Sequence, residues 1–146
     1  MKKRTKVFFI LTVLWMIAVF SFSAETASES TKTSMALLNR IVDFFNIDIT
    51  NVELFEGLLR SFAHFVLFAL GGVFAGAFVL YAVPKHKLIA TGLFGFGYAV
   101  LDEIHQIFVP GRAFEVKDIV VDVSGFLLGV VVVWLAVKVA RKIKHE

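Results

Sequence analysis

The sequence predicts an all-α integral membrane protein: a four-helix bundle with both termini in the cytoplasm and an extracytoplasmic amphipathic helix between helices 1 and 2. Hydrophobic residues make up 58% of the 146-residue chain, and the mean hydropathy is +0.82. The apolar residues collect in four segments, each close to the roughly 20 residues that a helix needs to cross a bilayer. Lys and Arg are concentrated in every second connection along the chain, as in proteins that cross a membrane several times. The length suits a single domain over residues 1–146.

The four expected spans cover residues 7–22, 61–83, 88–108 and 119–137. The second and fourth are clear spans, the first is short but adequate, and the third qualifies only if its last turns carry polar residues. A cleaved secretory signal competes with the first span, because "MKKRTK", an apolar run and "SFSAETA" also match a signal peptide and its cleavage site. An uncleaved helix is preferred, because the apolar run is at the long end for a signal peptide.

Basic residues indicate the orientation, because Lys and Arg mark the cytoplasmic ends of spans. They precede the first span, lie in the loop at residues 84–87 and follow the fourth span. The connection at residues 23–59 instead carries six acidic residues and two basic ones, so we expect it outside. The pI near 9.3 reflects these basic flanks, and we therefore expect membrane lipids as partners and no nucleic acid. The absence of Cys excludes disulfide and thiol chemistry.

The outer connection is expected to contain an amphipathic helix at residues 34–45, "SMALLNRIVDFF", where apolar residues recur at helical spacing. Such a helix would lie flat on the outer membrane surface or over the end of the bundle. Asn51 is a suitable N-cap for the approach to the second span.

Glycines predict where the spans pack closely. Small-x-x-x-small pairs let helix backbones approach each other in lipid. The second and fourth spans each contain one such pair, and the third span carries three glycines that would flatten it: Gly72 with Gly76, Gly125 with Gly129, and Gly92, Gly95 and Gly97. The last three spans should therefore form the compact core.

Polar residues gather at the extracytoplasmic ends of the spans. The stretch "LDEIHQIFVPGRAFEVKD", residues 101–118, ends the third span with several ionisable groups and turns tightly at "VPGR". Asp118 and Asp122 open the fourth span one helical turn apart, and Arg60 and His64 do the same in the second. Ionisable groups in a membrane are costly and usually face the bundle interior. The number of ionisable groups favours a polar pocket. A purely structural link between helices would need only one ion pair.

These motifs carry a family resemblance. "SFS" ending the first span, "RSFAHF" opening the second, "DEIHQIFVPGR" and "DIVVDVSGFLLG" together resemble the VanZ family of small membrane proteins. The resemblance implies a bacterial cytoplasmic-membrane protein connected with cell-envelope lipids or with resistance to the glycopeptide teicoplanin. The residues that match the family are Arg60, His64, Glu103, Gln106, Arg112, Asp118 and Asp122.

Two functional hypotheses assign roles to this pocket. In the first, an enzyme acts on a lipid-linked substrate at the outer leaflet, with Glu103, His64 and Asp122 as the catalytic candidates. The candidate substrate-binding residues are Arg60, Arg112, Gln106, His105 and Asp118, because guanidinium groups suit phosphate or carboxylate. Ser61 and Ser124 lie nearby but fit no nucleophile motif. In the second, the pocket binds a lipid head group, a wall precursor or the antibiotic without catalysis.

The residues raise three further hypotheses: a structural protein, a metal site and a transporter. A purely structural protein would use the charged cluster as an interhelical ion-pair network, with Arg60 and Arg112 against the carboxylates. A metal site of His64, Glu103, His105 and an Asp is disfavoured, because its ligands would come from separate helices and not from a compact zinc motif. No cofactor is therefore expected. Transport is also disfavoured, because no polar path crosses the inner half of the spans.

Overall fold

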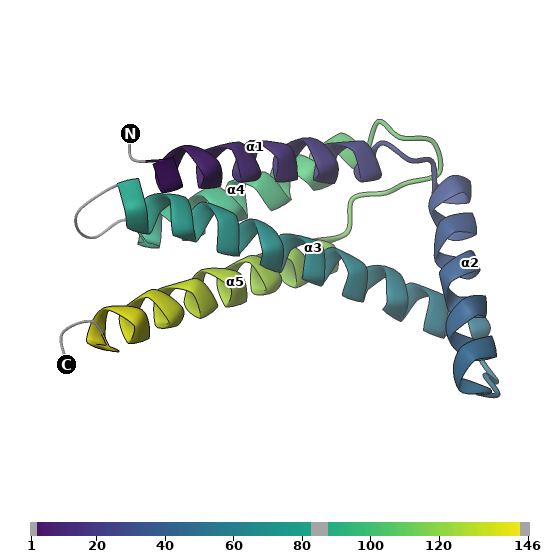
Figure 1. The fold of residues 1–146 in the computed structure, drawn as a ribbon. Helices are drawn as coiled ribbons and strands as arrows, with labels where there is room; N and C mark the ends of the chain where they lie inside the picture. Colours follow the sequence, from purple (N-terminus) through teal and green to yellow (C-terminus); the bar gives the residue numbers. More distant parts are fainter. Residues whose placement is uncertain (1–2, 83–87, 144–146) are drawn as a thin grey trace.

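The computed structural model describes residues 3–82 and 88–143, and this part of the chain contains five helices and no strands. The helices are α1 (Lys3–Ser23), α2 (Ala27–Phe45), α3 (Val52–Ala82), α4 (Leu88–Gln106) and α5 (Val116–Ile143). Four of them run lengthwise, and α2 crosses one end of the molecule (Figure 1). Residues 107–115 lie at the same end, here called the α2 end, whereas α1 begins and α5 ends at the opposite end. The predicted all-helical fold class is confirmed.

Three helical segments are long and apolar enough to cross a membrane: Lys3–Ser23, Val52–Ala82 and Val116–Ala140. They correspond to the expected first, second and fourth spans. The expected third span, α4, is not among them, and its last turns carry Asp102 and Glu103. The basic loop at residues 84–87 lies outside the described residues.

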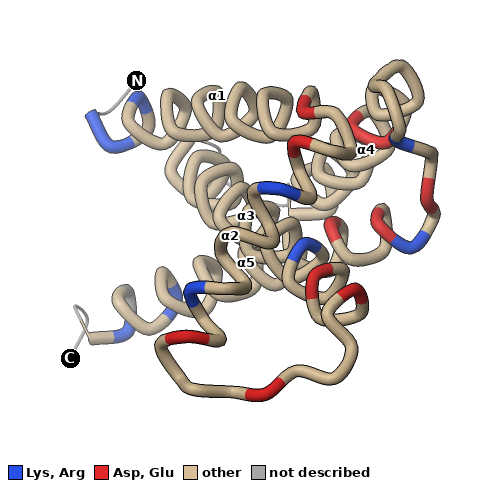
Figure 2. The backbone as a smooth tube through the Cα atoms, turned by 90° about the vertical axis from the view of Figure 1, so that its right-hand side faces the viewer, with Lys and Arg blue, Asp and Glu red and all other residues tan. Residues whose placement is uncertain are grey.

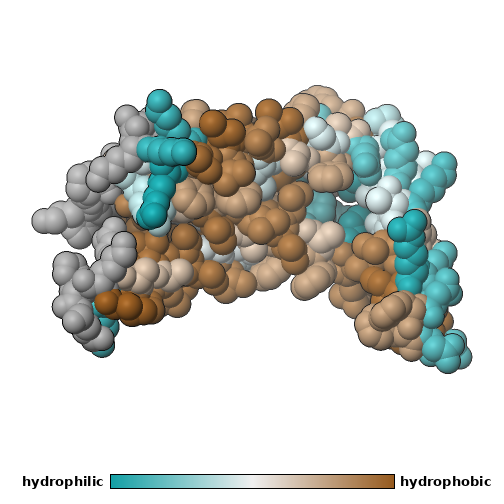
Figure 3. All heavy atoms as spheres, in the orientation of Figure 1, coloured by the Kyte–Doolittle hydropathy of each residue, from teal (hydrophilic) through white to brown (hydrophobic). Residues whose placement is uncertain are grey.

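Apolar side chains cover the middle of the molecule (Figure 3). Ile17 and Val131, for example, are 56% and 49% exposed. Large exposed apolar surfaces are rare on soluble proteins and mark contact with lipid or a partner. Together with the long apolar helices, this surface identifies a membrane protein.

Glycines bring α3 and α5 into direct backbone contact. A Cβ atom added at Gly72 would collide with the carbonyl oxygen of Phe126, and one at Gly129 would collide with that of Ala69. The predicted close packing of these two glycine pairs is confirmed. On α4 the prediction holds for Gly95, which faces the ring of Phe126, but not for Gly97, which has nothing within 4 Å.

Aromatic residues join α1 to this core. Trp15 is 3% exposed and its ring packs edge-on against Phe68, with the two ring centres 5.6 Å apart. Its indole N–H donates a hydrogen bond to the carbonyl oxygen of Leu67 at 2.8 Å. Tyr98 on α4 donates to the carbonyl oxygen of Met16 at 2.6 Å. α1 is therefore built into the core of the folded chain and not attached at its edge.

α2 confirms the predicted amphipathic helix but begins at Ala27, well before residue 34. Thr26 and Glu29 form a capping box, in which each side chain accepts a hydrogen bond from the backbone N–H of the other residue. The apolar pattern missed this first part of the helix because "ASESTKTS" is almost wholly polar. Leu38 is buried, and α2 packs against α3.

Two further predictions at the α2 end are confirmed: the N-cap at Asn51 and the tight turn at "VPGR". The backbone N–H of Leu54 donates to the side chain of Asn51 at 3.0 Å, so Asn51 caps α3, which starts at Val52 and not near residue 61. The backbone of Arg112 donates to the carbonyl oxygen of Val109 at 3.1 Å, closing a tight turn over Pro110 and Gly111. Gly111 has φ = 77°, the left-handed conformation that the third residue of a type II turn requires.

Candidate functional site

The candidate residues from the sequence all lie toward the α2 end. α3 carries Arg60 and His64, and α5 carries Asp118 and Asp122. The last turns of α4 and the segment that follows it supply the rest: Glu103, His105, Gln106 and Arg112. Side chains from three helices and one connecting segment therefore meet in one region.

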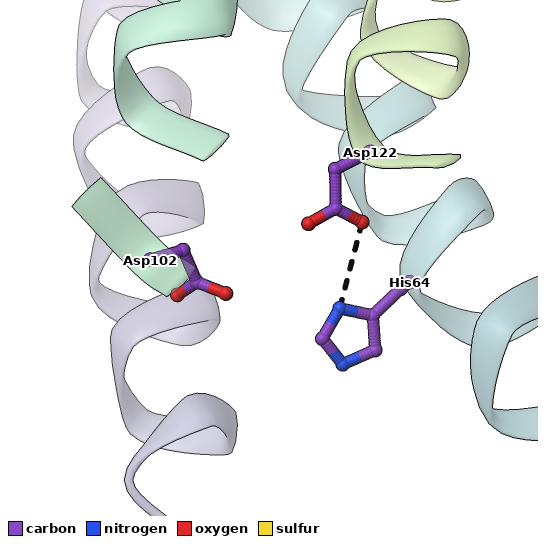
Figure 4. Close-up of side chains that lie close together, drawn as sticks. All are labelled: His64, Asp102 and Asp122. Atoms are coloured by element: carbon purple, nitrogen blue, oxygen red, sulfur yellow. Dashed lines mark ion pairs between the residues drawn. The ribbon is translucent and has the colours of Figure 1, made fainter. Parts of the chain in front are cut away.

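At its centre lies a group of three side chains, one from each of three helices: His64 on α3, Asp102 on α4 and Asp122 on α5 (Figure 4). Each offers a ligand atom within 4.8 Å of the other two, and we call this group the His64 cluster. Nδ1 of His64 lies 3.5 Å from Oδ1 of Asp122. Asp122 is 0% exposed, and within the described part of the chain neither of its carboxylate oxygens has a hydrogen-bond partner.

Asp102 belongs to the His64 cluster, although the sequence did not predict it as a catalytic or substrate-binding residue. It is buried, and its Oδ2 accepts two hydrogen bonds: from the hydroxyl of Ser23 at 2.8 Å and from the amide of Gln106 at 3.1 Å. The i, i+4 spacing of Asp102 and Gln106 signalled that these two side chains share a helix face. The contact with Ser23 could not be read from spacing, because the two residues are 79 positions apart.

Glu103 points elsewhere. It is 0% exposed, and its Oε2 accepts a hydrogen bond from the backbone N–H of Glu115 at 2.8 Å. Its Oε1 has no hydrogen-bond partner among the residues that the structure describes. Glu103 therefore holds the segment that leads into α5 and does not join the His64 cluster.

His105 is also separate from the cluster. Its ring stacks on Phe20 of α1 with the ring centres 4.3 Å apart. Its Nε2 is buried and finds no hydrogen-bond partner in residues 3–82 and 88–143. Glu115 forms an ion pair with Lys117, with Nζ and Oε2 2.8 Å apart. The hydrogen bond from Lys117 lowers the pKa of Glu115, which keeps this carboxyl ionised.

The two arginines do not form the ion-pair network considered from the sequence. Arg60 lies 3.8 Å from Glu56 on its own helix. The Nε of Arg112 donates to the backbone carbonyl oxygen of Glu25 at 3.4 Å. Among the described residues, neither arginine pairs with Asp118, Asp122 or Glu103. Their guanidinium groups thus retain donors for another acceptor.

Both arginines border a pocket of about 250 Å³ between α2, α3 and the end of α1, here called the α2 pocket. Its charged and titratable residues are Arg60, His64, Arg112 and Glu25. The remaining wall combines three hydroxyl side chains with five apolar ones: Ser30, Thr33 and Ser34, and Phe22, Leu37, Leu59, Ala63 and Leu67. Figure 3 shows the surface hollowed beside α2. Arg60, His64 and Arg112 also line a space of about 10 Å³ that reaches Asp118 and Asp122. The α2 pocket therefore adjoins the His64 cluster.

Comparison with known proteins agrees with the motifs. A family model described as VanZ/LLP1 matches residues 8–137, which include all the candidate residues. No curated protein and no solved structure matches the chain. Because the match covers most of the 146 residues, the chain belongs to the VanZ/LLP1 family.

Proposed function

We propose that this protein binds an anionic, lipid-linked molecule of the cell envelope in the α2 pocket, at the extracytoplasmic face of a bacterial cytoplasmic membrane. The observation that carries the proposal is the composition of the pocket wall. Arg60, Arg112 and His64 line the pocket together with a single acidic residue, Glu25, and the wall also contains five apolar side chains and three hydroxyl side chains. A head group with negative charge and an attached hydrocarbon chain would match the basic and the apolar side chains.

The proposal includes four spans with both termini in the cytoplasm, and α4 is then the third span along the chain. α4 runs beside the three apolar helices (Figure 1), and the acidic groups near its end lie against protein and not lipid. Figure 2 shows Lys and Arg near both chain ends, whereas the α2 end carries acidic residues together with several Lys and Arg. Since Lys and Arg mark the cytoplasmic side, the α2 end would face outward. The place of Trp15 in the core supports an uncleaved first helix.

The anion-binding role rests on the geometry of the arginines. Guanidinium groups offer planar, paired donors that fit phosphate and carboxylate oxygens. Arg112 directly follows the Pro110–Gly111 turn, and its Nε is tied to the backbone of Glu25, so its position is fixed from two sides. The Nη1 of Arg60 lies 3.8 Å from Oε1 of Glu56 on the same helix. Both can therefore turn donors toward a ligand in the α2 pocket.

A second candidate function is acid–base catalysis on the same bound molecule. It is favoured by the position of His64, which lines the α2 pocket and faces Asp122 behind it. A carboxylate behind an imidazole orients the ring and supports proton transfer, which typically contributes about 10²–10⁴ in rate. Glu103 lines neither space, so in this function His64 and Asp122 would carry the proton transfer.

Binding is tested in nanodiscs with lipids that differ only in their head group. Lipids with a phosphate or pyrophosphate head group should bind saturably, and a zwitterionic lipid with the same chains should not. Arg60→Gln and Arg112→Gln should each weaken binding by about tenfold or more, since a hydrogen bond to a charged group contributes about 1.5–3 kcal/mol. Arg40→Gln, on α2 but outside the α2 pocket, is the matched control. Equal affinity of all three variants would refute the anion site.

Turnover and resistance are tested separately. Mass spectrometry of the incubated lipid detects a product if the site is catalytic, and its absence alongside saturable binding selects the binding function. The resemblance also implies a link to teicoplanin. Cells that express the chain should then tolerate a higher concentration of teicoplanin than cells that express Arg112→Gln.

A further inference from the structure

The strongest unassigned feature is the His64 cluster. Its three side chains come from α3, α4 and α5, so the fold and not a local motif brings them together (Figure 4). Asp122 is wholly buried and points into the cluster, where its Oδ1 lies 3.5 Å from Nδ1 of His64. Among the described residues, neither of its oxygens has a hydrogen-bond partner. Asp102 is also buried, so two carboxylates face one imidazole in the interior. Buried charges in proteins are normally paired or coordinate a metal ion.

Neighbouring cations do not account for these carboxylates. Among the described residues, the ion pairs of Arg60 and Lys117 go to other carboxylates, and Arg112 donates to a backbone oxygen. A protonated His64 would supply one positive charge against the two aspartates. A divalent cation between them would balance both charges and satisfy the free oxygens of Asp122.

We propose that His64, Asp102 and Asp122 bind a divalent transition-metal ion, with Zn²⁺ as the best-matched species. Zn²⁺ accepts one imidazole nitrogen and two carboxylate oxygens at about 2.0–2.2 Å. Donors bound in a tetrahedron at those lengths lie about 3.4 Å apart. The donor atoms lie within 4.8 Å of one another, so modest side-chain rotations bring them to this spacing. Mg²⁺ and Ca²⁺ prefer oxygen ligands alone and fit less well.

The surroundings of the cluster suit a metal centre. Ser23 and Gln106 both donate to Oδ2 of Asp102, which orients this carboxylate and leaves its Oδ1 for the ion. The adjoining space of about 10 Å³, lined by His64 and Asp122, has room for about one water molecule. Three protein ligands with an open fourth position are characteristic of catalytic zinc sites. The ion would therefore face the α2 pocket across that space, although its binding does not depend on what the pocket holds.

The test measures metal binding directly, without any lipid or activity. The protein is purified with a tag that contains no histidine, stripped with a chelator, and titrated with Zn²⁺ or with Co²⁺ as a coloured substitute. Elemental analysis should then give about one ion per chain, and bound Co²⁺ should show the visible absorption of a low-coordinate site. His64→Gln and Asp122→Asn should bind the ion at least about tenfold more weakly. Glu115→Gln removes an exposed carboxylate just before the same helix, outside the His64 cluster and the two spaces beside it, and should bind like the wild type.

A second measurement covers variants that fold poorly. Asp102→Asn keeps an oxygen that accepts from Ser23 and Gln106 but loses the charged ligand. Zn²⁺ should raise the melting temperature of the wild type and of Glu115→Gln, because it binds the folded state, and it should not raise that of Asp102→Asn. The proposal is overturned if the stripped wild type binds no stoichiometric ion. It is also overturned if Glu115→Gln loses binding as fully as the cluster variants, or if those variants bind as the wild type does.

Discussion

The hydroxyl of Ser23, the last residue of α1, donates a 2.8 Å hydrogen bond to Asp102 on α4, and both side chains are buried. This bond fastens the first helix to the group of polar residues at the α2 end. It also gives a physical reason for the polar "SFS" ending of an otherwise apolar helix. Ser21 in the same motif has a different role, because its hydroxyl donates to the carbonyl oxygen of Ile17 in its own helix.

Ser23→Ala should therefore destabilise the protein, whereas Ser21→Ala should not. Removing the Ser23 hydroxyl takes one donor from a buried carboxylate, and such a loss costs about 1–3 kcal/mol. Ser21 is exposed, so water replaces its hydrogen bond. Thermal unfolding in detergent compares the two variants with the wild type. An equal melting temperature for both variants would contradict the role of Ser23 as the link to α4.

The contact between α3 and α5 makes a second prediction. Gly72→Ala places a methyl group against the backbone of Phe126, and Gly129→Ala places one against the backbone of Ala69. Backbone cannot move aside as a flexible side chain can, so each change should cost about 1–3 kcal/mol or prevent folding. Gly97→Ala is the control, because nothing lies within 4 Å of the added atom. It should leave the melting temperature unchanged or raise it slightly, since Ala favours helix over Gly.

The sequence predicted the helices more fully than their ends. Apolar length located α1, α3 and α5, because hydrocarbon thickness dictates how many apolar residues a span requires. It placed the start of α3 near residue 61, because the charged turns after Asn51 look unlike a span, although they continue the same helix. The early start of α2 was also missed, although Thr26 and Glu29 have the T-x-x-E spacing of a capping box.

The candidate site was predicted as a region but not as a set of contacts. Hydropathy and helical spacing predicted that the polar residues lie together at one end of the bundle, because ionisable groups avoid lipid. They could not pair His64 with Asp122, or separate Glu103 from both, because the rotation of each helix about its axis depends on packing. Because helix rotation could not be predicted, the sequence also did not identify Asp102 as a site residue. Helix rotation is fixed here by glycines such as Gly72 and Gly129, whose contacts become visible only in three dimensions.

A pH dependence is expected at the start of α2. Hydrogen bonds from Thr26 lower the pKa of Glu29 below its ordinary value of 4.5, so the folded helix favours the ionised carboxyl. This contribution is present above the pKa of the unfolded chain and is lost as the pH falls through the lowered folded pKa. Amide hydrogen exchange in the first turn of α2 should therefore accelerate at a pH below about 4.5 relative to neutral pH, after correction for the intrinsic rate. Glu29→Gln, whose side chain can still accept the hydrogen bond but cannot ionise, should exchange at the same rate at both pH values after the same correction. Equal protection of the wild type at both pH values would contradict the contribution of the ionised carboxyl.

The proposed orientation is tested with single cysteines, because the chain has none of its own. Ala113→Cys, exposed at the α2 end, should react in intact cells with a thiol reagent that does not cross membranes. Lys142→Cys, near the end of α5, should react only after the cells are opened. The reverse pattern would place the α2 pocket in the cytoplasm and remove the proposed extracytoplasmic substrate.

Two substitutions at Glu103 separate its structural contact from a catalytic role. Its Oε2 accepts the backbone N–H of Glu115, which holds the segment leading into α5. Glu103→Gln keeps an acceptor oxygen at this place, so its melting temperature should stay close to that of the wild type. Glu103→Leu has a similar volume but no acceptor, and the orphaned N–H should lower stability by about 1–3 kcal/mol. Lipid binding in nanodiscs should follow the same order, because Glu103 does not line the α2 pocket.

If Glu103 instead transfers a proton, the stable Gln variant would lose about 10²–10⁴ in turnover while still binding lipid. A Leu variant as stable as the wild type would show that the contact with Glu115 contributes little, and the burial of this carboxyl would then require a functional reason.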